Sequence, residues 1–289
     1  MKRVRLRSLA KINLDLRVLN KRADGYHELR TVFQTISLAD TIEITYTPSR
    51  RLALEIESDP VIPGNLIEKA AEALGIPGLF GIRLRKRIPM GGGLGGGSSN
   101  AAAMLMAIPA LTGKQVERKR LFEIAARLGS DVPFFLVGGT ALGLGRGTEL
   151  YPLAEFAARY AVLVAPGIHV STAEAYAALG RTRAPELTAT TELFDYTSAR
   201  NDFEPVVFAR HPELKAIKRK LKKSGADLAL MSGSGSTLFG IFADRVARDR
   251  AAAGLRESFD SEQVIAVSLV SARQYRAMWQ RLWQTDAAR

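Results

Sequence analysis

A glycine cluster is the part of this sequence whose residue types and spacing point most directly to chemistry. Residues 89–103 read PMGGGLGGGSSNAAA, so two runs of glycine and two serines lead into an alanine-rich segment of helical composition. Glycine loses more conformational freedom on folding than other residues, so the cluster indicates positive φ angles or close approach to a bulky group. Bare N–H groups at a helix N-terminus bind phosphate. We therefore interpret the loop as a phosphate cradle rather than a linker, which would not run directly into an amphipathic helix.

Two better-known glycine motifs do not fit this stretch. Gly91, Gly93 and Gly96 match G-x-G-x-x-G, but a dinucleotide-binding unit needs an apolar strand before the turn and an acidic residue about 20 residues later, at the end of a second strand. Here the preceding segment is rich in arginine, and the region around Glu117 is predicted to be helical. The P-loop pattern fails as well, because no lysine precedes the serines.

Composition limits the other kinds of site. The 289-residue chain is 47% hydrophobic and 24% charged, which is typical of a globular protein, and we favour two domains. It has no cysteine, which excludes disulfides, thiolate catalysis and cysteine-based zinc sites. Its three histidines, His27, His169 and His211, are not at ligand spacing, so we expect no resident metal site, and any magnesium would enter with a nucleotide.

The formal charge of +12 would suit nucleic acid, a membrane surface or small polyanionic substrates. Much of it lies in three runs, at residues 83–87, 117–120 and 215–224. In the last run the apolar residues share one side of a predicted helix, so we interpret the lysines as a solvated face. Charges interrupt every apolar run of residues 1–16, unlike a signal peptide or membrane span. We expect a cytoplasmic protein that binds neither nucleic acid nor membrane; the oligomeric state is not predicted.

The pattern of apolar residues predicts mixed helix and strand structure. Alternation and β-branching predict an early strand-rich half, with strands at residues 4–9, 29–38, 41–46, 52–56 and 81–88. Helices are predicted at residues 65–74, with Asn65 as N-cap, 99–111 and 121–128. A charged region at residues 153–159 is interpreted as a domain junction. Beyond it we predict strands at 161–166, 228–231 and 238–242, a helix at 172–179, the basic helix, and a final strand and helix.

Three segments together resemble the three motifs of the GHMP small-molecule kinases, namely residues 10–40, 87–103 and 231–240. Within them and beside them, DGYHEL (24–29), LGSDVPFFLVGG (128–139) and NDFEP (201–205) resemble the branch of this family that phosphorylates the 2-hydroxyl of a cytidyl-diphosphate sugar alcohol in the non-mevalonate route to isoprenoids. The resemblance implies an α+β fold of two domains. Residues 1–157 would form a ribosomal-S5-like, ATP-binding N-terminal domain, and residues 158–289 a ferredoxin-like C-terminal domain, with the substrate in the cleft between them.

The resemblance also implies catalytic roles. Phosphoryl transfer needs alignment, charge stabilisation and a carboxylate that accepts the hydroxyl proton. Asp131 matches that carboxylate, Lys11 the lysine that keeps it ionised and stabilises the attacking oxygen, and Asn13 a substrate contact. From the residues alone, Asp131 is equally well a turn or cap residue, Lys11 a solvated lysine and Asn13 a bulge or turn former.

ATP, with magnesium, would occupy the glycine loop. The residues implied are Pro89, Gly91, Gly92, Gly93, Leu94, Gly95, Gly96, Gly97, Ser98 and Ser99. One of the two serines would lie near phosphate or magnesium, and we expect Asn100 to cap the helix that follows. In the third motif, Ser234 and Gly235 would lie near the substrate; a plain glycine hairpin between two strands is the alternative.

Four further residues match contacts to the substrate in this branch, Tyr26, His27, Thr172 and Tyr176. Tyr26 and Tyr176 come from opposite halves of the chain, so we expect one ring on each face of the cytosine, with His27 at its edge. A lone aromatic at helical spacing is more often part of a core, so this prediction depends on the resemblance. We expect Trp279 and Trp283, at i and i+4, to dock the last helix.

Two other functions remain open at this point. A related kinase of the same family, acting on mevalonate, homoserine or galactose, is the nearer alternative, and the DGYH segment favours the cytidyl branch over it. An S5-like RNA-binding module is the second, but the sequence lacks the aromatic signature of an RRM.

Overall fold

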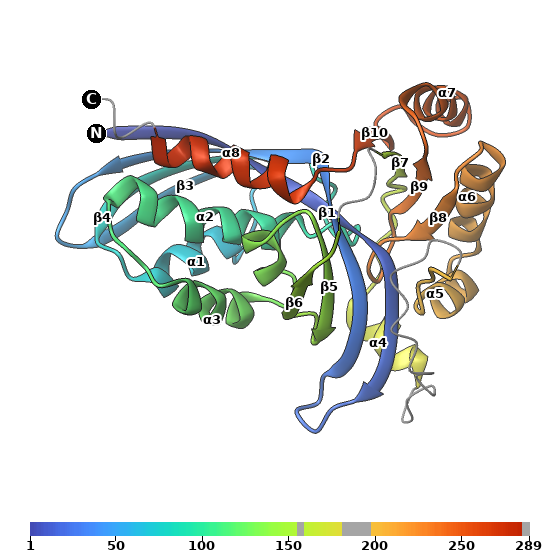
Figure 1. Ribbon diagram of the computed structural model, residues 1–289, viewed down its shortest axis with the longest axis horizontal. Helices are drawn as coiled ribbons and strands as arrows, with labels where there is room; N and C mark the ends of the chain where they lie inside the picture. Colours follow the sequence, from blue (N-terminus) through green and yellow to red (C-terminus); the bar gives the residue numbers. More distant parts are fainter. Residues whose placement is uncertain (155–158, 181–197, 285–289) are drawn as a thin grey trace.

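The computed structural model describes residues 1–154, 159–180 and 198–284 and contains two sheets, each with its own helices (Figure 1). The first sheet has six strands. They are β1 (Lys2–Lys21), β2 (His27–Thr47), β3 (Leu52–Asp59), β4 (Gly78–Arg85), β5 (Thr140–Gly145) and β6 (Glu149–Pro152). Their order is β3-β4-β2-β5-β6, with β1 paired to β2. Only β3 and β4 are parallel, and α1 (Leu66–Leu74) connects them.

β1 and β2 form one long antiparallel hairpin whose far end lies beside α4 (Thr172–Leu179) of the second half (Figure 1). The sequence predicted a break in β2 after residue 38, and this was wrong. Asp40, which reads as a turn residue, stays within the strand, because its buried carboxylate accepts hydrogen bonds from the N–H groups of Arg87 (2.7 Å) and Ile88 (2.9 Å). The same bonds explain why β4 ends at Arg85 and not at residue 88.

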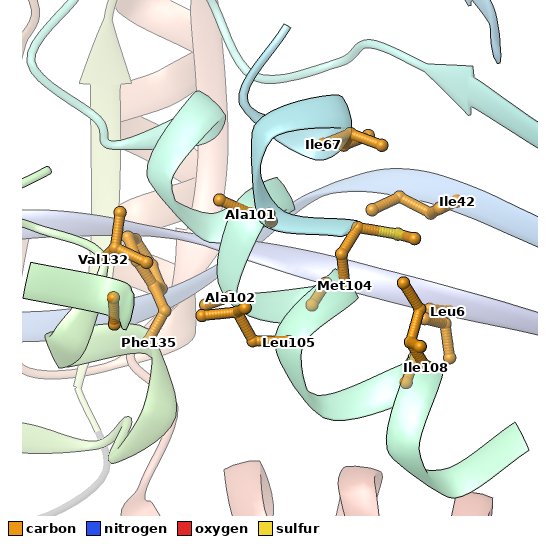
Figure 2. Close-up of a cluster of buried hydrophobic side chains, with 14 of the residues drawn as sticks. Leu6, Ile42, Ile67, Ala101, Ala102, Met104, Leu105, Ile108, Val132 and Phe135 are labelled. Carbon is orange, nitrogen blue, oxygen red and sulfur yellow. The ribbon is translucent and has the colours of Figure 1, made fainter. Parts of the chain in front are cut away.

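α2 (Gly96–Thr112) is the central helix of the first half and is buried nearly all round. Ala101, Ala102 and Ala103 are fully buried, so the backbone of α2 lies close to its neighbours. Figure 2 shows Met104, Leu105 and other side chains of α2 packed between Leu6 of β1, Ile42 of β2, Ile67 of α1 and Phe135. Each large apolar side chain buried in this way contributes about 1.5–3 kcal/mol to folding. This core fixes the start of α2, which borders the site.

The segment after α2 leads back to the sheet. α3 (Arg118–Leu128) ends at Gly129, and a short 3₁₀ turn, Pro133–Leu136, places Phe134 and Phe135 in the core. Asn65 caps α1 by accepting from the Ile67 N–H at 3.1 Å, as predicted.

The second sheet is antiparallel and has the order β10-β7-β9-β8. Its strands are β7 (Tyr160–Val164), β8 (Leu228–Met231), β9 (Leu238–Phe242) and β10 (Val264–Ser268), and its helices are α4, α5 (Glu204–Arg210), α6 (Pro212–Lys223) and α7 (Arg245–Arg256). Leu214, Ile217 and Leu221 of α6 face the sheet, so the lysines of α6 lie outside, as predicted. No helix in the described ranges is long and apolar enough to cross a membrane.

The last helix, α8 (Ala272–Gln284), returns to the first half and lies along α2 (Figure 1). Tyr275 and Trp279 are buried in the first core, so the prediction that Trp279 docks this helix is confirmed. The side chain of Trp283 and the expected boundary at residues 157/158 lie outside the described parts of the structure.

Candidate active site

A cleft of about 1110 Å³ lies between the two halves of the molecule. It brings together the pair that the sequence predicted to be catalytic, most of the glycine loop and the predicted aromatic residues. The predicted residues that line it are Lys11, Asn13, Tyr26, His27, Pro89, Gly91, Gly92, Gly93, Leu94, Gly95, Gly96, Gly97, Ser98, Asp131, Thr172, Tyr176 and Ser234. Ser99 and Gly235 do not line it.

Lys11 and Asp131 form an ion pair at the cleft surface, with 3.1 Å between Nζ and Oδ2. Lys11 lies on β1 where the pairing with β2 is irregular, and its N–H donates to the Leu94 carbonyl at 3.0 Å. Its side chain is 3% exposed, whereas that of Asp131 is 32% exposed. The lysine is therefore held in place, and the carboxylate is open to a ligand in the cleft.

A chain of buried hydrogen bonds holds the side chain of Lys11 in place. Lys11 Nζ donates to Asn13 Oδ1 at 2.7 Å, Asn13 Nδ2 donates to Thr31 Oγ1 at 2.8 Å, and that hydroxyl donates to the Asp15 carbonyl at 2.7 Å. All of these groups are buried. Asn13 therefore positions the lysine through a direct contact, a role that the sequence did not predict for it.

The glycine loop ends in a helix N-terminus that faces the cleft. Gly91, Gly93 and Gly95 have φ angles of 71°, 75° and 70°, a region that disfavours other residues. Gly95 is the N-cap of α2 and has no side chain to cap it, and the first turn carries no acidic residue. The first intrahelical bond runs from the Ser99 N–H to the Gly95 carbonyl, so the preceding N–H groups are available to an anion.

Two glycines of this loop leave room for another loop of the protein. A Cβ on Gly93 would lie 2.0 Å from the Ser232 carbonyl oxygen, and one on Gly92 would lie 2.4 Å from Thr237 Oγ1. The loop between β8 and β9, which carries the third motif, therefore packs directly on the glycine loop. Ser232 Oγ donates to the Gly93 carbonyl at 2.9 Å, and Asn201 Nδ2 donates to the Met231 and Gly233 carbonyls at 2.7 Å each.

Two residues at the start of α2 differ from the prediction. Ser99 does not reach the cleft, because its hydroxyl donates to the Leu9 carbonyl at 2.6 Å and accepts from Ser8 Oγ at 2.7 Å. The prediction that Asn100 caps the helix was wrong, because α2 already begins at Gly96. Asn100 lies within the helix and donates through Nδ2 to the buried carboxylate of Asp40 at 3.1 Å.

The aromatic residues gather at the other end of the cleft, in a different arrangement from the expected one. Tyr176 stacks on His27, with 4.8 Å between ring centroids and 18° between planes. Tyr26 is instead covered by the guanidinium of Arg146, whose Cζ lies 3.6 Å from the ring centroid. The hydroxyl of Thr172, the first residue of α4, lies 2.8 Å from the hydroxyl of Ser234 in the loop between β8 and β9.

Burial shifts the pKa values of the two stacked rings in opposite directions. It lowers the pKa of His27, with a smaller contribution from the nearby charge of Lys21, so the imidazole is neutral at pH 7. Burial also raises the pKa of Tyr176, and the negative charge of Asp131 acts in the same direction. A neutral imidazole has one donor and one acceptor nitrogen, which suits the edge of a nucleobase.

The lining residues that the sequence did not predict for the cleft include Asn65, Lys86, Arg146 and His169. Lys86 was read as part of a basic run, but its ammonium forms a buried ion pair with Asp40 beside the N-terminus of α2. Arg146 lies in the turn between β5 and β6, and its Nε is buried without a hydrogen-bond partner. No turn was predicted here; the glycines on either side of Arg146 could have indicated one, but no local pattern indicates what the turn faces.

Comparison with known proteins agrees with this geometry. The family models for the GHMP kinases N terminal domain and the GHMP kinases C terminal domain match residues 65–139 and 190–261. A protein of Solibacter usitatus named 4-diphosphocytidyl-2-C-methyl-D-erythritol kinase is 52% identical over 96% of this chain and 92% of its own, and one of Geobacter sp. strain M21 with the same name is 43% identical over 89% and 96%. A crystal structure of 4-(cytidine 5'-diphospho)-2C-methyl-D-erythritol kinase superposes with a TM-score of 0.79, at 38% identity over 92% of this chain and 99% of that one. The expected α+β, two-domain fold is confirmed, and the chain belongs to the GHMP kinases and, within them, to the family of 4-diphosphocytidyl-2-C-methyl-D-erythritol kinases.

Proposed function

We propose that this enzyme transfers the γ-phosphate of ATP to the 2-hydroxyl of 4-diphosphocytidyl-2-C-methyl-D-erythritol. The observation that carries the proposal is the ion pair of Lys11 and Asp131, which lies in one cleft with the free N-terminus of α2 and with the stacked rings of His27 and Tyr176. The cleft thus offers an anion site to ATP, and a carboxylate and an aromatic site to the cytidyl alcohol.

Asp131 is the group that accepts the proton of the attacking hydroxyl. It is more exposed than its partner, so a hydroxyl in the cleft can reach it. The Lys11 ammonium pairs with the carboxylate before the hydroxyl binds and then stabilises negative charge on the attacking oxygen. Because Asn13 holds Nζ at 2.7 Å, the lysine can do both without moving.

The N–H groups at the start of α2 bind the triphosphate. They combine the positive end of the helix dipole with unpaired donors, and the positive φ angles of the glycines shape the loop that leads to them. Lys86 lies next to this N-terminus and adds a positive charge, although its partner Asp40 offsets part of it. Ser98, and not Ser99, is the serine available to the nucleotide.

Magnesium fits this site only as a companion of the nucleotide. No three His, Cys, Asp or Glu side chains among the described residues lie together in a way that could hold a metal ion. Asn100 lines the cleft, and its Oδ1 is buried without a hydrogen-bond partner. This atom is an oxygen ligand of the kind that magnesium prefers. When bound with ATP, the ion would neutralise charge on the phosphates, held by Asn100 and phosphate oxygens.

The cytidyl group is proposed to bind where His27 and Tyr176 stack. Tyr176 is fixed from behind by Phe203, at 4.8 Å and 90°, so it can act as a rigid platform for the base. In the structure the ring of His27 covers this platform, so the base must displace the imidazole. We further expect the reaction to take place in the cytoplasm.

The proposal is tested by ATP turnover against the cytidyl substrate, mevalonate, homoserine and galactose. We expect turnover with the cytidyl substrate only. Asp131→Asn should lower kcat by about 10²- to 10⁴-fold, the range for general acid–base groups, with a small change in KM. Asp227→Asn, at an exposed carboxylate paired with Arg159, is the matched control and should leave kcat unchanged. Preference for another alcohol, or more than about a tenth of the wild-type rate in Asp131→Asn, would contradict the proposal.

A further inference from the structure

A second cavity, of about 540 Å³, opens on a different part of the molecule from the catalytic cleft and shares no residue with it. Three exposed arginines line it, Arg5 and Arg7 of β1 and Arg87 after β4, and we name it the arginine cavity. Its other described lining residues come from β1 (Leu6), β2 and β10, and none of them is acidic.

The arginine cavity exists because two strands separate. The chain beyond β10 is joined to β2 by the bridge between Ile36 and Leu269, and the Ser268 N–H donates to Ser37 Oγ at 3.0 Å. From that point β10 and β2 diverge, and residues 265–267 face residues 37–41 across the cavity. The walls of the cavity are therefore formed mainly by strands of the two sheets, and not by a loose loop.

The open edge of β10 adds main-chain groups to this space. The hydrogen bonds from the Ala165 N–H to the Gln263 carbonyl and from the Leu269 N–H to the Arg159 carbonyl direct the odd-numbered residues of β10 toward β7. Because the direction alternates along a strand, the N–H and C=O of Ala266 point away from β7, on the side of the open edge. β10 is the last strand of its sheet, so Ala266 has no neighbouring strand to bond among the described residues.

The charge of the three arginines is poorly compensated. Within the described residues, Arg7 and Arg87 form no ion pair, and Arg7 Nη2 donates only to the Ser37 carbonyl, at 2.9 Å. Arg5 lies 3.8 Å from Glu43, which Arg3 already binds at 2.8 Å. The nearby carboxylate of Asp40 is buried and occupied by Lys86, Asn100 and two backbone N–H groups. A cavity lined by one sign of charge concentrates ions of the opposite sign.

We propose that the arginine cavity binds a small anion that carries a phosphate or diphosphate group. Guanidinium groups bind phosphate oxygens through paired, charge-assisted hydrogen bonds, and three of them on one cavity can surround such a group. The size of the cavity lies within the range of small-molecule sites. The site is separate from the proposed ATP site, although Arg87 directly follows Lys86 of the catalytic cleft.

The test is calorimetric titration of the protein with inorganic pyrophosphate, in the presence of saturating AMP-PNP so that the glycine loop is occupied. We expect wild type to bind one pyrophosphate. The double variant Arg7→Gln/Arg87→Gln should bind it at least about tenfold more weakly, because each charge-assisted bond contributes enough for that factor. The control Arg83→Gln/Arg219→Gln removes two charges from exposed arginines elsewhere and should bind like wild type.

Three outcomes would overturn the proposal. They are no pyrophosphate binding by wild type under AMP-PNP, binding by Arg7→Gln/Arg87→Gln as tight as that by wild type, and an equal loss of affinity in both double variants, which would indicate only a general effect of net charge. Vesicles that contain phosphatidic acid form a second arm. If they bind through Arg7 and Arg87 while pyrophosphate does not, the site is a lipid contact and the proposal of a small-anion site is wrong. Thermal unfolding of each variant confirms that it is folded.

Discussion

At one end of the cleft, the ring of Tyr176 lies between the rings of His27 and Phe203. The contact with Phe203 is edge-on and comes from the second half, whereas the contact with His27 is stacked and comes from the hairpin of the first half. An aromatic face covered by an imidazole of similar size is suited to exchange that ring for a nucleobase, because stacking depends little on the identity of the ring. The two halves of the molecule therefore meet at this residue.

Replacing this ring tests the proposed cytosine site at the scale of one residue. Tyr176→Ala should raise KM for the cytidyl substrate by about 5- to 150-fold, since stacking contributes about 1–3 kcal/mol per base, with a smaller change in kcat. Tyr176→Phe keeps the ring and is the control; it should behave like wild type. Steady-state kinetics at pH 7, where His27 is neutral, measure both variants. An unchanged KM in Tyr176→Ala would remove Tyr176 from the substrate site.

At the scale of elements, the glycine loop before α2 and the loop between β8 and β9 interlock. Gly92 and Gly93 allow this, because their missing side chains leave room for Thr237 and for the Ser232 carbonyl. The Thr237 N–H donates to the Gly92 carbonyl at 3.3 Å, so the two loops also share a backbone bond. The glycine loop thus owes its shape to a segment more than 130 residues away in the sequence.

Two glycine substitutions distinguish the effect of this packing on stability from the effect of helix propensity. Gly93→Ala should destabilise the protein by about 2 kcal/mol or more, because alanine at φ 75° is strained and its Cβ would meet the Ser232 carbonyl. Gly97→Ala, in the first turn of α2, has only Leu66 within reach, at 3.7 Å, and should keep or slightly raise stability. Thermal unfolding measures both. If the two variants unfold at the same temperature, the interlocked loops do not hold the structure together.

Local patterns predicted most of the elements but not the contacts between them. α1, α4, β8 and β9 lie where composition and periodicity predicted them, and Asn65 caps α1 as expected. The predictions of the extent of β2 and of the role of Asn100 were wrong for the same reason. Both features depend on Asp40, whose buried carboxylate joins β2, the segment after β4, and α2. The glycine loop was predicted as a phosphate site from its composition, but its contact with Ser232 is long-range and leaves no local signal.

At the scale of the whole molecule, the described chain passes between the two halves more than once. The β1–β2 hairpin extends from the first half to α4, the described chain from β7 to β10 forms the second sheet, and α8 returns to pack on α2 (Figure 1). Leu16 and Val18 of β1 belong to the second core, and Tyr275 of α8 belongs to the first. The cleft therefore lies between halves that share strands and helices, which restricts how far they can separate.

The contact of α8 with the first half can be tested by removing one hydroxyl group. Tyr275 is buried, burial raises its pKa so that the hydroxyl stays protonated, and it donates to the Phe135 carbonyl at 2.6 Å. Phe135 follows Asp131 by one turn, so this bond supports the segment that carries the proposed base. Tyr275→Phe keeps the ring but leaves the carbonyl unpaired, and we expect a loss of about 1–3 kcal/mol of stability.

Thermal unfolding should register that loss as a melting temperature lower by about 2–4 °C per kcal/mol. Tyr151→Phe removes a hydroxyl from an exposed ring, and as the matched control it should melt like wild type. Since the substitution acts on the backbone that follows Asp131, kcat of Tyr275→Phe should fall while KM for ATP stays close to the wild-type value. A melting temperature equal to that of Tyr151→Phe would mean that α8 is held by apolar packing of Tyr275 and Trp279 alone, and that the last helix does not support the catalytic segment through this bond.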